Sequence, residues 1–277
     1  MKRLLSLIVC CAGGIILANC DLQECVNCDN DKEYDQRCSP GQKITVESDT
    51  EDYYITNTIL YDGSDEETET QDQYRQCITY DKRGKGLTIQ WQWFWPENQD
   101  IVAYPGILYG YKPWETAPPQ TEFPVAAEHF SARADYSMEI EAEGQYNIAF
   151  DIWCGSGDSP SVDTITHEVL VWVHNSMMTP YGVLVGTVTV NGADYDLYFQ
   201  DDRTDQDGDS GAVWDYFAFV AHEETAAGSL ELGPFIDYLV DNAYMKSSTY
   251  VDSIEFGNQV ISGFGTVDLT SYSITME

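Results

Sequence analysis

Apolar and polar side chains alternate along much of the chain beyond residue 40, in short runs separated by turn-forming residues. Successive side chains of a strand point to opposite faces, so this pattern predicts strands that are buried on one side. The predicted strands are residues 42–47, 53–61, 87–95, 146–153, 168–173, 184–190, 194–199, 216–220 and 271–276. Only residues 232–244 have helical spacing, with Pro234 near the start. Many short strands and one helix predict an antiparallel β-sandwich.

The first 40 residues follow a different pattern. Lys2 and Arg3 precede an apolar run over residues 4–18, which is typical of a secretory signal and too short to span a bilayer convincingly. Residues 20–40 are rich in Asp, Asn, Glu and Cys without apolar periodicity, and therefore read as a tether. We predict a signal peptide at 1–19, an acidic Cys-containing tether at 20–40 and one β-sandwich domain at 41–277. The protein is then secreted or otherwise extracytoplasmic.

The cysteines leave two questions open. Leu17-Ala18-Asn19-Cys20 is similar to a lipoprotein cleavage site except at Asn19, so either Cys20 is acylated and anchors the chain to a membrane, or ordinary cleavage occurs nearby. Beyond the signal stand Cys20, Cys25, Cys28, Cys38, Cys77 and Cys154. An even number in an oxidising compartment favours disulfides over metal ligation. Spacing does not fix the connectivity; the pairing that we favour is Cys38 with Cys77.

Charge and aromatic content narrow the choice of partner. The formal net charge is −34, which disfavours nucleic acid and anionic membranes but is indifferent to a neutral polysaccharide. Seven Trp and 19 Tyr exceed what a core of this size needs, so some rings should line a surface. Trp91, Trp93 and Trp95 fall on one strand face, which we interpret as core for two of the three. The alternative, a platform on which sugar rings stack, suits Trp95 and Trp172 best.

Two acids interrupt apolar strands. Glu168 shares a strand face with Leu170 and Trp172, so an acid and an aromatic ring would point into the same groove. The alternative is an edge-strand glutamate that faces water. Asp151 stands in a second apolar strand, and if the two strands are neighbours the carboxyls could share a proton or a hydrogen bond.

These segments resemble glycoside hydrolase family 12. Glu168-Val169-Leu170-Val171-Trp172 is similar to the family's nucleophile strand, and Phe150-Asp151-Ile152 to the strand whose Asp supports the nucleophile. The other matching segments are Trp91-Gln92-Trp93, Tyr104-Pro105-Gly106-Ile107, Lys112-Pro113-Trp114, Pro180-Tyr181-Gly182 and Phe256-Gly257-Asn258-Gln259-Val260-Ile261-Ser262-Gly263. The resemblance covers the chain from about Tyr53 to its C-terminus.

The resemblance implies a fold and a reaction. The fold is a jelly-roll β-sandwich of two antiparallel sheets, one of them bent around a concave substrate cleft, with one helix on the convex side. The reaction is retaining endo-hydrolysis of β-1,4-glucan or xyloglucan by a monomer, with Glu168 as nucleophile, Asp151 as its support and position 259 as acid/base. The implied substrate-binding residues are Trp172, Asn57, Tyr61, Trp95 and Pro180.

Gln259 departs from that pattern, because the family has Glu at the acid/base position. A retaining glycosidase uses two carboxyls about 5 Å apart, and an amide cannot donate the required proton. Glu255 lies four residues earlier, about 13 Å along a strand, and is no ready substitute. A deliberate substitution, a sugar-binding relative without turnover and an enzyme that recruits another acid all stay open. The rivals to an enzyme are a non-hydrolytic β-glucan-binding protein and a structural envelope protein.

We predict no cofactor. Asp205, Asp207 and Asp209 invite a structural calcium site, but Ser210 stands where the EF-hand loop requires Gly, so a solvated acidic loop is the preferred interpretation.

Overall fold

A computed structural model describes residues 34–47, 52–60, 74–81, 88–114, 121–204 and 211–276. The chain divides into two units, residues 1–31 and 32–277, and the first lies wholly outside the described ranges. The predicted signal peptide, the lipidation of Cys20, and Cys25 and Cys28 therefore remain predictions. Among the helices of these ranges, none has the length and apolar character needed to cross a membrane.

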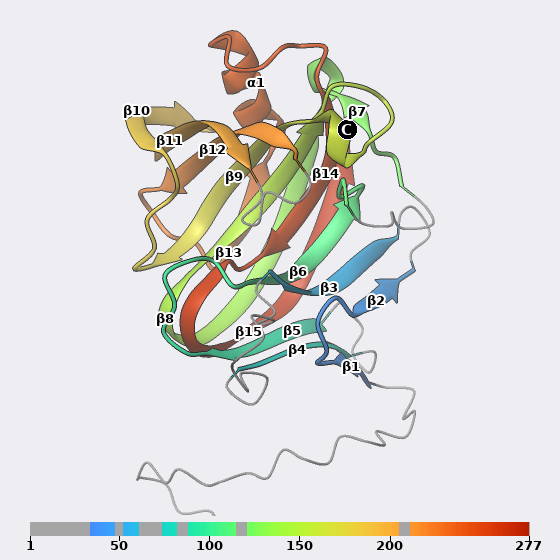
Figure 1. The fold of residues 1–277 in the computed structure, drawn as a ribbon, viewed down its shortest axis with the longest axis vertical. Coiled ribbons are helices and arrows are strands. Elements are labelled where there is room, and N and C mark those ends of the chain that lie inside the picture. The colour runs from blue at the N-terminus through green and yellow to red at the C-terminus, as the bar shows by residue number, and fades with distance from the viewer. Residues whose placement is uncertain are drawn as a thin grey trace, which may run out of the picture. The chain divides into compact units, whose positions relative to one another are not determined.

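The second unit is built almost entirely of strands that fold into two layers (Figure 1). The elements are β1 Tyr34–Arg37, β2 Lys43–Val46, β3 Tyr53–Ile59, β4 Arg75–Asp81, β5 Thr88–Trp95, β6 Ala103–Gly110, β7 Val125–Ala126, β8 Ala132–Gly155, β9 Ile165–Ser176, β10 Val183–Val190, β11 Ala193–Thr204, β12 Val213–Ala221, β13 Ala227–Glu231, α1 Gly233–Asp241, β14 Tyr250–Gly257 and β15 Val260–Met276. Two short 3-10 helices, Ala127–His129 and Val162–Thr164, complete the set.

The long strand β8 belongs to both layers (Figure 1). Its first half pairs with β15 and β13 in an outer sheet, which continues through β5 and β4 to β1. Its second half pairs with β14 and β9 in an inner sheet, ordered β2-β3-β6-β14-β8-β9-β12-β11-β10. Within the described ranges, the strand pairs are antiparallel except β9 with β12, which is parallel. The predicted jelly-roll sandwich with a single α-helix is confirmed.

The core lies between the two sheets and is rich in aromatic rings. Trp91, Trp93 and Trp95 all face it from β5, and Phe150 and Phe256 face it from the inner sheet. Helix α1 contributes Phe235, Ile236 and Leu239 to the same core cluster. The helix begins close to its predicted start but ends at Asp241, because Asn242 caps it and Ala243 adopts a left-handed φ of 60°.

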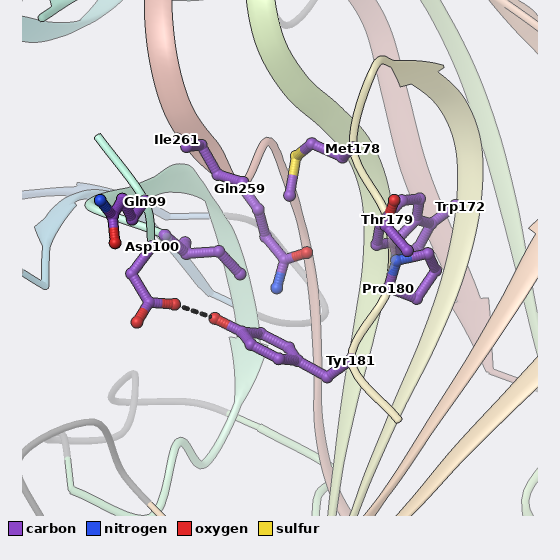
Figure 2. Close-up of a pocket in the computed structure, with 10 residues that line it drawn as sticks. Gln99, Asp100, Trp172, Met178, Thr179, Pro180, Tyr181, Gln259 and Ile261 are labelled. Carbon is purple, nitrogen blue, oxygen red and sulfur yellow. Dashed lines mark hydrogen bonds between the residues drawn. The ribbon is translucent and has the colours of Figure 1, made fainter. Parts of the chain in front are cut away.

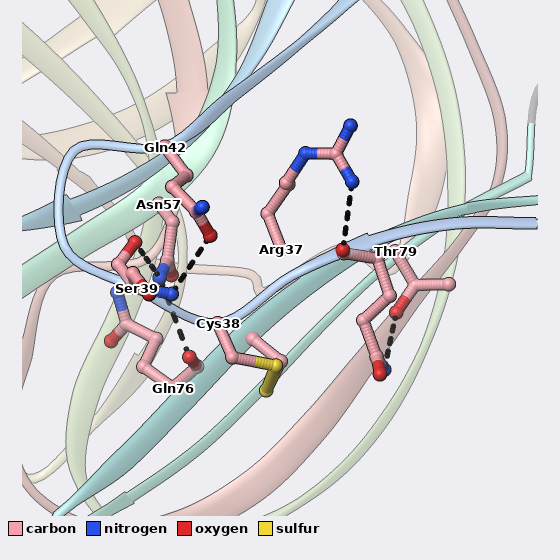
Figure 3. Close-up of a disulfide and its surroundings, with 9 residues drawn as sticks. Arg37, Cys38, Ser39, Gln42, Asn57, Gln76 and Thr79 are labelled. Atoms are coloured by element: carbon pink, nitrogen blue, oxygen red, sulfur yellow. Dashed lines mark hydrogen bonds between the residues drawn. A yellow bond between two sulfur atoms is a disulfide. The ribbon is translucent and has the colours of Figure 1, made fainter. Parts of the chain in front are cut away.

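The start of the sheet corrects the predicted domain boundary. Strand β1 pairs with β4 and lies inside the range 20–40 that was predicted as a tether, so the β-rich unit begins before residue 41. The disulfide Cys38–Cys77 confirms the favoured pairing and ties the residues after β1 to β4 (Figure 3). Cys154 is a buried free thiol.

Candidate active site

The register of the inner sheet brings the two predicted acids onto one face. In neighbouring strands, residues directly opposite one another share a face. Asp151 on β8 lies opposite Leu170 on β9 and opposite Glu255 on β14. Glu168 is two positions from Leu170, and therefore on the same face. Val169 and Val171, which alternate with these residues, belong to the inter-sheet core, whereas Leu170 and Trp172 belong to a separate cluster. This second side of the inner sheet is called the cleft face below.

Glu168 is held by two groups from the next strands. The indole Nε1 of Trp214 on β12 donates a hydrogen bond of 2.7 Å to Oε2 of Glu168. The Nε of Arg203 on β11 lies 3.4 Å from the same oxygen. The Arg203 guanidinium also stacks on the ring of Tyr181, 3.8 Å from its centroid, and lies 5.2 Å from that of Tyr216. A buried carboxylate is tolerated when it is paired in this way.

A buried ion pair sits beside Asp151. The ammonium of Lys112, just beyond β6, lies 2.9 Å from Oε2 of Glu255, and both side chains are almost fully buried. The cleft face therefore gathers three carboxyls, Asp151, Glu168 and Glu255, and two cations, Lys112 and Arg203. An excess of buried negative charge favours binding of a proton by one of the carboxyls.

The pKa values indicate where that proton resides. Burial, reinforced by the carboxylates of Glu168 and Glu255, raises the pKa of Asp151 well above its ordinary value. Burial also raises the pKa of Glu168, but the Arg203 charge and the Trp214 hydrogen bond oppose that rise. Burial and the neighbouring carboxylates thus favour the neutral form of Asp151, whereas the Arg203 charge and the Trp214 hydrogen bond favour the ionised form of Glu168.

Gln259 lies in the two-residue connection between β14 and β15 and is fixed by Asn147 on β8. The backbone N–H of Gln259 donates to Oδ1 of Asn147 at 3.0 Å, so the other end of that side chain, Nδ2, must be the donor to Oε1 of Gln259 at 2.6 Å. The orientation of both amides is therefore set by a backbone donor. The Nε2 group of Gln259 has no hydrogen bond to any residue within the described ranges, and Figure 2 shows it turned away from the carbonyl oxygen, into a pocket.

That pocket has a volume of about 90 Å³ and lies on the cleft face. Trp172 and Pro180 line it together with Gln259 (Figure 2). Asp100, from the segment between β5 and β6, and Tyr181, from the segment between β9 and β10, close one side through a hydrogen bond of 2.5 Å from the phenol to the carboxylate. Since Tyr181 also contacts Arg203, the pocket adjoins the surroundings of Glu168.

The structure thus places five of the predicted site residues on one face: Glu168, Asp151, Gln259, Trp172 and Pro180. Two others lie elsewhere. Asn57 has the opposite strand parity and is 0% exposed, with its amide nitrogen donating to the carbonyl of Ser39 at 3.0 Å (Figure 3). Trp95 is 4% exposed in the inter-sheet core, where Tyr74 stacks on it. Neither is available to a ligand, so both predictions were wrong. Tyr61 lies outside the described residues.

Sequence reasoning missed Arg203, Trp214, Lys112, Asp100 and Tyr181 as site residues. Their positions depend on how loops and distant strands pack. Only on the strand of Trp214 and Tyr216 does the period-two alternation indicate which side chains share a face with Glu168. It also missed Trp114, which is 43% exposed and packs edge-on against Trp153 at 4.8 Å beside Trp214. This is the exposed ring that Trp95 was expected to supply.

Within the described ranges, no group of three or more His, Cys, Asp and Glu residues is placed to hold a metal ion. Asp205, Asp207 and Asp209, which were considered for calcium, lie outside those ranges.

Comparison with known proteins decides the family. Residues 64–277 match the family model described as glycosyl hydrolase family 12. The chain belongs to glycosyl hydrolase family 12. It is 28% identical over 232 residues to endoglucanase S of Pectobacterium parmentieri, covering 81% of this chain and 82% of that protein. It is 29% identical over 136 residues to a xyloglucan-specific endo-beta-1,4-glucanase A of Aspergillus niger, covering 47% and 52% of the two chains.

The fold of this family 12 chain has close structural counterparts. The family 12 xyloglucanase from Bacillus licheniformis superposes with a TM-score of 0.75 at 27% identity, covering 88% of this chain and all of the other. The chain is therefore a glycoside hydrolase by family and fold, and its cleft face is the candidate active site.

Proposed function

We propose that this family 12 protein is a secreted, monomeric, retaining endo-β-1,4-glucanase that acts on cellulose-type glucan or xyloglucan in polysaccharide breakdown. The observation that carries the proposal is that Glu168, held by Trp214 and Arg203, shares one face of the inner sheet with Asp151, Trp172 and Gln259. The names of the relatives, an endoglucanase and xyloglucan-specific glucanases, support the substrate class.

In the proposed reaction Glu168 attacks the anomeric carbon and the glycosidic bond breaks. The Trp214 indole and the Arg203 guanidinium hold the attacking carboxylate in one orientation. The neutral Asp151 beside it can donate a hydrogen bond to Glu168 once the glycosyl ester has formed and again when it is released. Trp114, which is 43% exposed, offers its ring to the face of a sugar, and Trp172, which is 1% exposed, forms part of the pocket wall.

Gln259 limits what this position can do. Its Nε2 points into the pocket and can donate a hydrogen bond to a glycosidic or hydroxyl oxygen, but it has no proton to transfer. Loss of general acid catalysis typically lowers a rate about 10²–10⁴-fold. Position 259 therefore binds sugar in this chain, and turnover of an unactivated glucan requires an acid from elsewhere.

The nucleophile assignment is tested by the variant Glu168→Ala. We expect the wild-type chain to release reducing ends from xyloglucan or soluble cellulose, and the variant to lose at least about 10³-fold in kcat while retaining its fold by circular dichroism. Full activity in Glu168→Ala would contradict the proposal, because no glycosyl ester could then form at that residue.

A glucan-binding protein on the same fold is the second candidate, and Gln259 is the observation that favours it. Aryl β-cellobiosides with very good leaving groups need no acid, so an enzyme that lacks only its acid still releases the aryl group, and azide accelerates turnover by attacking the glycosyl ester in place of water. A chain that binds insoluble glucan in a pull-down but never releases the aryl group would be a binding protein. A chain that does neither would be structural.

A further inference from the structure

The pocket that contains Gln259 also contains a carboxylate. Asp100 is exposed, and its side chain reaches the pocket from the segment between β5 and β6 (Figure 2). The amide nitrogen of Gln259 and the carboxylate of Asp100 approach the pocket from different elements and line the same volume of about 90 Å³. A carboxyl is thus present next to the position where the family's acid/base residue is absent.

Asp100 is fixed in place by a chain of contacts that begins at the nucleophile. Glu168 lies 3.4 Å from the Arg203 guanidinium, which stacks on Tyr181 at 3.8 Å, and the phenol of Tyr181 donates its 2.5 Å hydrogen bond to Oδ1 of Asp100. Burial raises the pKa of the Tyr181 phenol, so this group remains a donor at neutral pH. Tyr181 is the titratable side chain whose hydrogen bond holds Asp100, and Arg203 lies against the ring of Tyr181.

The other carboxyls of the cleft face are committed elsewhere. Glu255 is 2% exposed and forms a buried ion pair with Lys112 at 2.9 Å. Asp151 stands one strand from Glu168 and acts on the nucleophile itself. Asp100 alone among these acids combines solvent access with a place in the pocket of Gln259.

We propose that Asp100 is the general acid/base of this enzyme, positioned by Tyr181. The proposal rests on the glucanase function above. In the first step Glu168 forms a bond to the anomeric carbon, the bond from that carbon to the leaving oxygen breaks, and the proton of the Asp100 carboxyl moves to that oxygen. In the second step a water oxygen bonds to the anomeric carbon, its proton passes to Asp100, and the Glu168 carboxylate is released.

The test compares Asp100→Asn with Glu255→Gln on two substrates, xyloglucan and 2,4-dinitrophenyl β-cellobioside. Asp100→Asn should lower kcat on xyloglucan about 10²–10⁴-fold, keep first-step turnover of the aryl glycoside and become sensitive to azide. Glu255→Gln should affect both substrates to the same extent and show no response to azide. Tyr181→Phe should lower kcat on xyloglucan more than on the aryl glycoside, but by a smaller factor than Asp100→Asn does.

Each outcome has one meaning. If Asp100→Asn cleaves xyloglucan like the wild type, or loses both substrates equally, Asp100 is not the acid/base. If Glu255→Gln instead shows the selective loss and the azide response, the acid is Glu255 and the proposal is overturned. If the wild-type chain cleaves neither substrate, both the proposed glucanase function and the role of Asp100 are wrong. If the wild type cleaves xyloglucan and Asp100→Asn cleaves it equally well, only the role of Asp100 is wrong.

Discussion

The hydrogen bonds of Asn147 determine how the side chain at position 259 is oriented on the cleft face. Asn147 is obliged to accept from the backbone N–H of residue 259, so it always offers its Nδ2 to the side chain at that position. A glutamate there would accept the same hydrogen bond and turn its second oxygen into the pocket, where Gln259 turns its amide nitrogen. The hydrogen bonds from Asn147 would therefore hold an acid/base glutamate at position 259 in the same way, but Gln259 itself has no proton to transfer to a leaving oxygen.

Another buried acid, Asp252 on β14, has no evident catalytic use. It is 0% exposed, and neither of its carboxylate oxygens has a hydrogen-bond partner within the described structure. Burial raises its pKa from 3.8 to about 7. The close approach of its Oδ2 to Gly155, where an added Cβ would lie at 2.6 Å, shows how tightly this site is packed.

We predict that Asp252 makes the protein less stable as the pH rises. A group whose pKa is raised by folding contributes stability that is fully present below its unfolded pKa and lost as the pH rises through its folded pKa, here about 7. The loss between pH 4 and 8 amounts to at most about 4 kcal/mol. Urea unfolding should show this decline in the wild type and a flatter profile in Asp252→Asn. Parallel profiles would show that Asp252 is not the group responsible.

At the scale of elements, the ion pair of Lys112 and Glu255 joins the end of β6 to the middle of β14. Removing one partner of a buried pair leaves an uncompensated charge and typically costs about 3–5 kcal/mol. We therefore expect Lys112→Met to lower the free energy of unfolding by that amount. The double variant Lys112→Met with Glu255→Gln should recover most of the loss, since it removes both charges. A double variant as unstable as the single one would assign the cost to packing.

The same two strands approach each other through glycines. Gly257 lies opposite Gly106, and a Cβ on Gly257 would meet the Pro105 carbonyl oxygen at 2.3 Å and the Gly106 Cα at 2.9 Å. Because both obstacles are backbone, Gly257→Ala should force β6 and β14 apart and lower stability by about 1–3 kcal/mol. It should also move Gln259, two residues further on, and weaken glucan binding. Gly228→Ala on β13, where a Cβ would meet nothing within 4 Å, is the matched control and should leave both measurements unchanged.

Sequence reasoning succeeded where a charged side chain interrupts an otherwise apolar strand. Glu168 and Asp151 interrupt apolar runs, and period-two alternation alone placed Glu168 on the face of Trp172. The prediction for Trp95 failed because alternation within one strand does not say which face meets the core. The prediction for Asn57 came from the family resemblance, and in this chain Asn57 faces the inter-sheet core. Strand β4 was missed because a polar residue, Gln76, faces inward there. Its amide nitrogen donates to the Thr58 carbonyl, and its amide oxygen accepts from the Trp95 indole.

Loops set the limit of that reasoning. Asp100 and Tyr181 come from two separate connections, and their hydrogen bond exists only because both connections meet over the cleft face. Arg203 reaches Glu168 from β11, two strands away in the sheet. No local periodicity encodes such contacts, so the sequence pattern predicts Glu168 and Asp151 as site residues but not Asp100, Tyr181 or Arg203.

For the whole molecule, the N-terminal edge of the β-rich unit depends on a covalent closure. The disulfide Cys38–Cys77 spans 39 residues and holds the loop in which Ser39 and Gln42 bond to each other and Ser39 accepts from Asn57 (Figure 3). The large excess of acidic residues opposes compactness through self-repulsion, and a cross-link that restricts the unfolded chain offsets part of that cost.

Loop-closure entropy for a separation of this length corresponds to about 4 kcal/mol, and native disulfides typically contribute about 2–5 kcal/mol. We therefore expect Cys38→Ala with Cys77→Ala to lower the urea midpoint by a corresponding amount, with no change in the activity of the folded fraction, since neither cysteine lies on the cleft face. The dependence of unfolding free energy on urea should also become steeper, because the unfolded chain without the cross-link exposes more surface. Equal midpoints would mean that the pairing of β1 with β4, which survives the substitution, is sufficient to hold this edge without a covalent bond.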